Sequence, residues 1–227
     1  MRRPQSMLAS SRVTAWASLS TLIFFAAEWI VSSSWRGQYA YREDLLGPLG
    51  VAYCGPAGEW PCSRIYPAMN VGLIITGLAV TVVAAGWLVQ RVTDRGHAVL
   101  LGVAGLGLAA SGAVTNQIDY QWNFTAIIAF MTLGSVSILF IAMGSTTVMT
   151  VERRIVAVAA GVVSVIGFLC FVGGHSLVGP GGAQRMAVYG VLVGVIALGT
   201  AGMRKPSDDD PALADGAADR ELAGAPQ

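Results

Sequence analysis

Six apolar runs, each of about twenty residues and long enough for a membrane helix, alternate with polar segments along the chain. At about 1.5 Å per residue, a helical run of this length crosses about 30 Å of hydrocarbon. Lipid offers no partner to unpaired backbone groups, so each run is predicted to be helical. The pattern therefore predicts an all-α integral membrane fold, a six-transmembrane-helix bundle. The runs cover residues 13–32, 68–89, 98–115, 123–146, 155–174 and 185–203.

The first run, 13–32, has two interpretations. It follows a short basic segment, as the apolar part of a signal peptide does. However, it is longer than a typical signal-peptide core, and the sequence that follows it, Ser32-Ser33-Ser34-Trp35, is a poor cleavage site. We therefore expect a retained first helix.

Composition supports the membrane class. Hydrophobic residues make up 54% of the 227 residues, charged residues only 12%, and the mean hydropathy is +0.62. A soluble domain has about 25% charged residues. The net charge of +1 gives no basic surface, so no nucleic-acid partner is predicted.

Lysine and arginine are distributed unevenly between the two sides of the predicted bundle. An even number of spans puts both termini on one side, and cytoplasmic loops carry an excess of these residues. We therefore predict a cell (inner or plasma) membrane protein with both termini in the cytoplasm. The terminal side carries Arg2, Arg3, Arg12, Arg91, Arg95, Arg153, Arg154, Arg204 and Lys205; the other side carries Arg36, Arg42, Arg64 and Arg185.

Three regions follow from this pattern. Residues 1–12 form a basic cytoplasmic N-terminus, and residues 13–203 form the transmembrane domain, with an outer cap loop at 33–67. Residues 204–227 hold six acidic side chains among many Ala, Gly and Pro. Such a segment buries too little apolar area to offset its ordering entropy, so it is predicted to be a disordered tail, or else a partner-binding one.

The cap loop contains two of the three cysteines, Cys54 and Cys62, separated by eight positions with Gly55-Pro56 between them. On the oxidising outer side this spacing predicts a disulfide. Two free thiols are the alternative, and a redox pair is disfavoured because the C-x-x-C spacing is missing.

Polar residues gather at the predicted outer ends of the helices. Glu28 is the one acidic residue well inside a span, where an ionisable group is costly and needs a partner. Arg185 is its strongest candidate partner, with Arg64 and Arg36 as rivals. We predict either a binding pocket for water, a lipid head group or a partner's side chain, or a structural network that ties the cap to the bundle. The predicted residues are Glu28, Asn70, Asp119, His175 and Arg185.

Small residues mark helix contacts. The third run is composed almost entirely of small and aliphatic residues around Gly105, so we expect it at the centre of the bundle. Gly190 and Gly194 form a G-x-x-x-G pair in the sixth run. Packing inside the bundle is the first interpretation of this pair, and a homodimer face is the alternative.

Catalytic signatures are missing from the sequence. The two histidines, His97 and His175, fall on opposite sides of the predicted membrane, and no phosphate loop, nucleophile elbow or metal-binding motif is present. We therefore predict no catalytic residue, no metal and no cofactor.

Four short motifs stand at 47–50, 69–78, 105–112 and 182–189, beginning Gly47-Pro48, Met69-Asn70, Gly105-Leu106 and Gly182-Ala183. Together they resemble the bacterial multi-pass membrane family Domain of Unknown Function 998, over residues 13–203. The chain departs from that family at Pro48, where relatives often have Glu, and at 122–124, where they often have a histidine. The family name implies no activity.

Three functions remain open from the sequence. The first is a non-catalytic accessory subunit or lipid-contacting scaffold, with membrane lipid and a membrane-protein partner or a second copy as its contacts. The second is a small transporter or permease-like protein, which needs polar groups near the midplane. The third is a membrane-embedded lipid-modifying enzyme with a site at the outer rim.

Overall fold

The computed structural model describes residues 8, 10–52, 62–144, 150–174 and 177–200. Six helical spans are long and apolar enough to cross a membrane, which confirms the all-α six-helix prediction. No β-strand occurs among the described residues; Trp35 and Ser63 form an isolated bridge. The elements are α2 (Ser11–Ser20), α3 (Leu22–Ser33), η1 (Gly47–Gly50), α4 (Tyr66–Gln90), α5 (Arg95–Ala113), α6 (Tyr120–Met143), α7 (Val151–Val172) and α8 (Gly179–Gly199).

The first span, Ser11–Ser33, consists of α2 and α3 with a joint at Thr21. The hydroxyl of Thr21 donates to the carbonyl of Ser18 at 2.6 Å, and the hydroxyl of Ser18 donates to that of Ala15 at 2.8 Å. Such bonds from Ser and Thr back to the preceding turn bend helices. The joint is therefore a local effect of two buried hydroxyls, within one continuous span.

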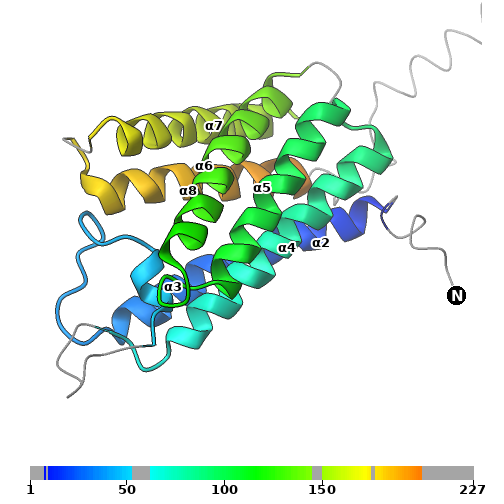
Figure 1. Cartoon of the computed structure of the whole chain (residues 1–227). Helices are drawn as coiled ribbons and strands as arrows, with labels where there is room; N and C mark the ends of the chain where they lie inside the picture. Colours follow the sequence, from blue (N-terminus) through cyan, green and yellow to red (C-terminus); the bar gives the residue numbers. More distant parts are fainter. Residues whose placement is uncertain (1–7, 9, 53–61, 145–149, 175–176, 201–227) are drawn as a thin grey trace, which may run out of the picture.

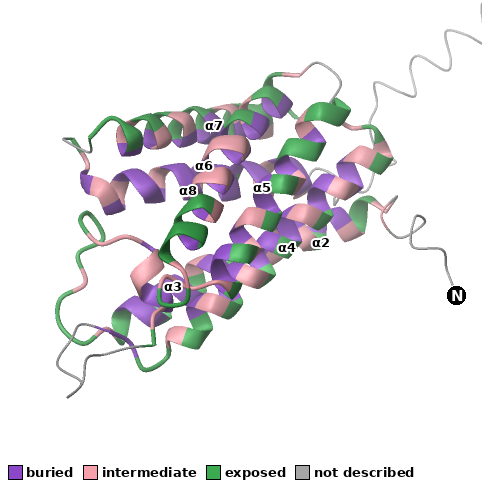
Figure 2. Cartoon of the chain, in the orientation of Figure 1, coloured by how far each residue is buried: buried purple, intermediate pink, exposed green. Residues whose placement is uncertain are grey.

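The spans form two tightly paired sets, α4 with α5 and α7 with α8, and α6 lies between them (Figure 1). The start of α2 and the end of α8 lie at one end of the bundle, and the cap residues lie at the other. Figure 2 shows the buried residues on the inward faces of the helices and the exposed ones on the outward faces.

The most buried span is α8, whereas the sequence pattern predicted α5. In the apolar stretch of α8, 72% of the residues are buried, against 39% in α5. One side of α5 packs closely on α4, because a Cβ on Gly105 would lie 2.7 Å from the carbonyl oxygen of Gly77. Its other side leaves Val103 and Leu106 exposed. Small residues allow a close approach on one side, but they do not place a helix at the centre.

Gly190 and Gly194 both pack within the bundle. A Cβ on Gly190 would lie 2.5 Å from the carbonyl oxygen of Ala160 on α7, and one on Gly194 would overlap Ile138 on α6. The two glycines therefore face two different neighbouring helices of the same chain. Packing within the bundle therefore accounts for the close contacts of both glycines.

The outward faces are strongly apolar. On α7, for example, Ile166 is 46% exposed and Leu169 is 60% exposed. Contiguous apolar surface on this scale is unfavourable in water and is typical of helices that contact lipid. Together with the six apolar helices, these faces make the chain a multi-pass membrane protein.

Candidate functional site

A buried ion pair lies under the cap. Glu28 of α3 is 2% exposed and Arg185 of α8 is 5% exposed, and the Arg185 Nε donates to the Glu28 Oε1 at 2.7 Å. The sequence pattern placed Arg185 at the start of the last helix, but α8 begins at Gly179. Pro180 lies in the first turn, where its fixed φ favours a helix start. Arg185 is therefore nearly two turns inside the helix.

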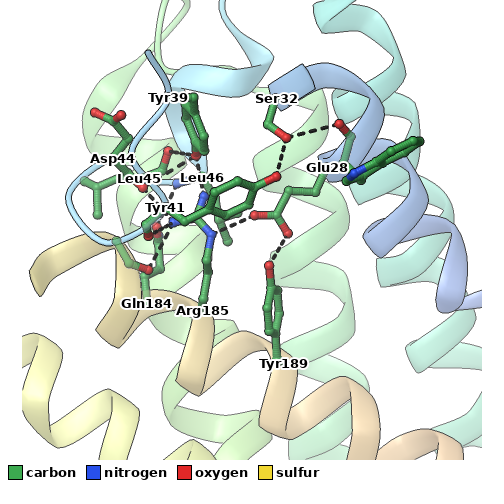
Figure 3. Close-up of polar contacts among 12 residues, drawn as sticks. Glu28, Ser32, Tyr39, Tyr41, Asp44, Leu45, Leu46, Gln184, Arg185 and Tyr189 are labelled. Atoms are coloured by element: carbon green, nitrogen blue, oxygen red, sulfur yellow. Dashed lines mark hydrogen bonds and ion pairs between the residues drawn. The ribbon is translucent and has the colours of Figure 1, made fainter. Parts of the chain in front are cut away.

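The guanidinium of Arg185 binds the cap chain as well as Glu28 (Figure 3). Its Nη1 donates to the carbonyl oxygens of Tyr41 at 2.8 Å, Asp44 at 2.7 Å and Gly181 at 3.1 Å. Its Nη2 donates to the hydroxyl of Tyr39. Arginine suits this position because its planar group directs several donors in fixed directions. One side chain thus holds the backbone of the cap at two points.

The carboxylate of Glu28 has a second partner on α8. Tyr189 follows Arg185 by one helical turn, so both side chains project from the same side of the helix. The Tyr189 hydroxyl donates to the Glu28 Oε2 at 2.6 Å. The rings of Phe24 and Phe25 pack against Tyr189, with centroids 6.1 and 5.0 Å from its own. Both carboxylate oxygens are therefore hydrogen-bonded within an apolar surround.

Two cap tyrosines close the site from above. Tyr39 donates from its hydroxyl to the carbonyl of Leu45 at 3.1 Å, and Tyr41 shares a hydrogen bond with Ser32 of α3. The guanidinium carbon of Arg185 lies 5.3 Å from the ring centre of Tyr39 and 4.9 Å from that of Tyr41. Burial raises the pKa of Tyr39 to about 12, so this phenol is neutral at physiological pH.

Of the five residues predicted for the site, the structure joins Glu28 and Arg185 directly. Asn70 instead donates from Nδ2 to the carbonyl of Gly50 at 3.0 Å, which ties η1 to α4. Asp119 caps α6 by accepting from the backbone N–H of Trp122 at 3.1 Å. His175 lies outside the described residues.

Cys54 also lies outside the described residues, so the disulfide with Cys62 stays a prediction. Cys62 itself is buried, at 1% exposure, where the chain leaves the cap toward α4. The carbonyl of Cys62 accepts from the backbone N–H of Arg36 at 2.8 Å, which brings together the two ends of the cap.

The sequence pattern did not predict four residues at this end of the bundle: Tyr39, Tyr41, Gln184 and Tyr189. Tyr189 carries a usable signal, because its spacing of four from Arg185 places both on one side of a helix. Gln184 lies on α8 beside Arg185 and accepts from the backbone N–H of Leu46 at 2.8 Å. The two cap tyrosines carry no such signal, since residues 34–46 form no helix or strand from which their direction follows.

The arrangement uses its charges to hold the cap on the bundle. Glu28 has a partner for each oxygen, and Arg185 donates to the cap, to its own helix and to Glu28. In the part of the chain that the structure describes, no group of three His, Cys, Asp or Glu side chains could bind a metal.

The fold and the site define an all-helical multi-pass membrane protein with a cap fixed by a buried ion pair. Comparisons with protein-family models, with curated proteins and with solved structures find no match to this chain.

Proposed function

We propose that the chain is a non-catalytic membrane protein, an accessory subunit or lipid-contacting scaffold that presents a fixed cap to a partner in the membrane. The observation that carries this proposal is the position of the buried ion pair. Arg185 joins α3, through Glu28, to the cap carbonyls of Tyr41 and Asp44. A catalytic or transported ligand would need such groups to be free, whereas here they bind the protein itself.

We call the ion pair of Glu28 and Arg185, with its hydrogen bonds to Tyr189 and to the cap, the lock. The cap surface above the lock has the character of a contact surface. Arg36, Gln38, Arg42 and Glu43 are all exposed, while Leu46 and Leu49 below them are fully buried. A surface that is held rigid costs little conformational entropy on binding, which favours recognition of a partner. A polar membrane-protein segment at the same membrane face is the kind of partner that fits.

The proposal includes a topology and a family. It places the chain in a cell membrane of bacterial type, with both termini in the cytoplasm, the cap outside and a Cys54–Cys62 disulfide in it. The excess of Lys and Arg on the terminal side supports this orientation. The short motifs that resemble Domain of Unknown Function 998 support a place in that family.

Topology is tested with reporters. A reporter fused after Lys205 should behave as cytoplasmic, and one inserted near Gly58 as external. Mass mapping without reductant should find Cys54 and Cys62 joined. The reverse location of either reporter contradicts the orientation, and two free thiols in protein from an oxidising compartment contradict the disulfide.

The scaffold role is tested by photo-crosslinking in the native membrane. A photoreactive amino acid at the exposed position Gln38 should give one discrete protein adduct. Arg185→Lys keeps the charge but loses the forked donors that hold the cap. This variant should reduce the adduct severalfold at equal protein level. The same photoreactive group at Val163, on the apolar face of α7, serves as the control and should label lipid.

Two results contradict the scaffold role. One is a cap position that yields no protein adduct in any membrane where the chain is expressed. The other is an adduct that Arg185→Lys leaves unchanged although hydrogen exchange shows the cap released, because recognition would then not depend on a fixed cap.

A further inference from the structure

A second polar feature lies beside the ion pair and is separate from it. A hollow of about 20 Å³ opens between the cap, the start of α6 and α8, with room for a water-sized group. Three carboxamide side chains lie in its lining, Asn116, Asn123 and Gln184, together with the phenol of Tyr120. None of the described residues that line it is charged. The hollow therefore suits a neutral hydrogen-bonding group, because its described lining has no charge to balance that of an ion.

Gln184 brings an unused donor to this hollow. The residue is 3% exposed, and its Oε1 accepts from the backbone N–H of Leu46 at 2.8 Å. Its Nε2 makes no hydrogen bond to any described residue. This atom keeps some accessible surface, unlike the unpaired hydroxyls of Thr76 and Ser137, which are fully enclosed. Gln184 lines the hollow, so we infer that this donor is directed into it.

Asn123 brings an unused acceptor. The residue is 5% exposed, and its Nδ2 donates to the carbonyls of Ser111 at 2.7 Å and Val114 at 2.8 Å. Because both partners are carbonyl oxygens, the donating atom is the amide nitrogen, and Oδ1 is the acceptor that remains. The Oδ1 accepts from no described residue and is likewise not fully enclosed. Leaving a buried acceptor or donor unpaired costs about 1–3 kcal/mol, so a ligand that pairs both is favoured.

Of the three amides, Gln184 and Asn123 are the two that are nearly fully buried, and their unpaired donor and acceptor are therefore the costly ones to leave without a partner. A hydroxyl can accept from the Gln184 amide and donate to the Asn123 oxygen at the same time. An ester carbonyl can only accept, and a phosphate would need a cation that the described lining lacks. The complementary group is therefore an alcohol.

The mouth of the hollow points to a lipid as the source of that alcohol. Tyr120 is 57% exposed and Phe124 is 36% exposed, and their rings stack at 5.8 Å beside the amides. Next to them Trp122 is 69% exposed. Exposed Tyr and Trp at a helix end are typical of the head-group level of a bilayer. A hydroxyl carried by a lipid head group lies at this depth.

We propose that the hollow between Asn123 and Gln184 is a binding site for the hydroxyl of a neutral membrane lipid. This inference deepens the proposed scaffold function, because it names the group by which the scaffold contacts lipid. The inference depends on the proposed function in one respect: both require the chain to lie in a lipid bilayer.

The test uses the full chain in lipid nanodiscs and native mass spectrometry. The probes are 1,2-dioleoylglycerol, which has a free hydroxyl, and its 3-O-methyl ether, which cannot donate. Wild-type protein should retain the alcohol about tenfold more tightly than the ether, because about 1.4 kcal/mol, close to one hydrogen bond, corresponds to that factor. Soluble glycerol at the same concentration should not compete.

Two variants remove the site in different ways. Gln184→Glu keeps an acceptor for Leu46 and removes the amide donor, and Gln121→Glu makes the same change at an exposed position outside the hollow. Asn116→Leu fills the hollow and breaks no hydrogen bond of the described chain, so it should fold normally. Each site variant should reduce the preference for the alcohol to less than about twofold, about 0.4 kcal/mol, whereas Gln121→Glu should retain it.

The inference is overturned by equal retention of the alcohol and the ether, which would mean that the hollow holds water only. It is also overturned if Asn116→Leu keeps the full preference, or if glycerol competes as well as the lipid. Loss of the cap crosslink with an intact alcohol preference would contradict the scaffold role alone. An intact crosslink without the preference would contradict this inference alone.

Discussion

Helix α8 makes contact with its neighbours in two opposite ways. Toward α3 and the cap it extends Arg185 and Tyr189, whose long side chains reach Glu28 across the gap between the helices. Toward α7 it presents Gly190, and the two backbones nearly touch, since a Cβ there would lie 2.5 Å from the Ala160 carbonyl. The first contact is made by long polar side chains. The second is a close approach of two backbones at a residue without a side chain.

This difference determines how each contact fails. The contact with α3 depends on two charges that satisfy each other, so it fails when one group is removed. The contact with α7 depends on space that is already filled by backbone, so it fails when atoms are added. Deletions at one contact and additions at the other should therefore be the damaging changes.

The largest expected effect is at Glu28. Glu28→Leu leaves Arg185 buried without its anion, which should cost about 3–5 kcal/mol of unfolding free energy. Unfolding in bicelles measured by steric trapping gives this value. The control is Glu43→Leu, because Glu43 pairs with Arg42 at 3.3 Å on the surface, where both side chains are more than half exposed. An exposed pair contributes about 0–1 kcal/mol.

The double variant Glu28→Leu/Arg185→Met sharpens this test. Removing both charges should recover part of the loss, because no isolated charge remains buried. Recovery should be incomplete, since the carbonyls of Tyr41 and Asp44 lose their donor. If the double variant is no more stable than Glu28→Leu alone, the cost does not come from an unpaired charge.

The second effect is at Gly190. Gly190→Ala adds one methyl group where the Ala160 carbonyl and Ser164 leave no space, so it should cost about 1–3 kcal/mol. Gly102→Ala is the matched control: its Cβ would meet only Ala84 at 3.7 Å, an ordinary contact. That variant should be neutral or slightly stabilising, because alanine favours a helix over glycine. Equal losses in the two variants would contradict the close approach of α7 and α8.

The same contrast explains which parts could be predicted from sequence. The six spans follow from apolar runs, and the packing at Gly105, Gly190 and Gly194 follows from small residues at helical spacing. Glu28 and Arg185 stand out because charges inside spans need partners. In each case a local rule fixes the outcome.

The cap contacts could not be predicted, because no local rule fixes them. Tyr39 and Tyr41 are directed by a chain path with no regular period, and that path is set by Arg185, far away in the sequence. The prediction that α5 lies at the centre of the bundle was wrong for a related reason. Which helix is central depends on how all the spans pack together, and the composition of one helix does not determine that.

A smaller effect is expected at Tyr39, the cap end of the lock. Tyr39→Phe removes the hydroxyl that bonds Arg185 and the Leu45 carbonyl, which should cost about 0.5–1.5 kcal/mol and speed hydrogen exchange in residues 39–46. Folding raises the pKa of Tyr39 from 10 to about 12. The free energy of unfolding that the neutral Tyr39 hydroxyl contributes is therefore complete below pH 10 and is lost as the pH rises toward 12.

Phenolate absorbance measures the pKa of Tyr39 and so checks the direction of this pH dependence. In the difference between wild type and Tyr39→Phe, the missing tyrosine should titrate close to pH 12. A midpoint near pH 10, the ordinary value for tyrosine, would show that Tyr39 is not buried against the lock.

The smallest effect is expected at Ser164, inside the contact between α7 and α8. Its hydroxyl donates to the Ala187 carbonyl at 2.6 Å and lies 2.5 Å from the hydroxyl of Ser135. Ser164→Ala removes these bonds but keeps the Cβ that packs against Gly190, so it isolates hydrogen bonding from packing. The cost should be about 0.6 kcal/mol, the average for such bonds between membrane helices. Ser33→Ala, which loses an exposed bond to Ile30 within its own helix, is the control and should be close to neutral. A loss at Ser164 as large as that at Gly190 would mean that polar bonds, and not bare backbone contact, hold this side of α8.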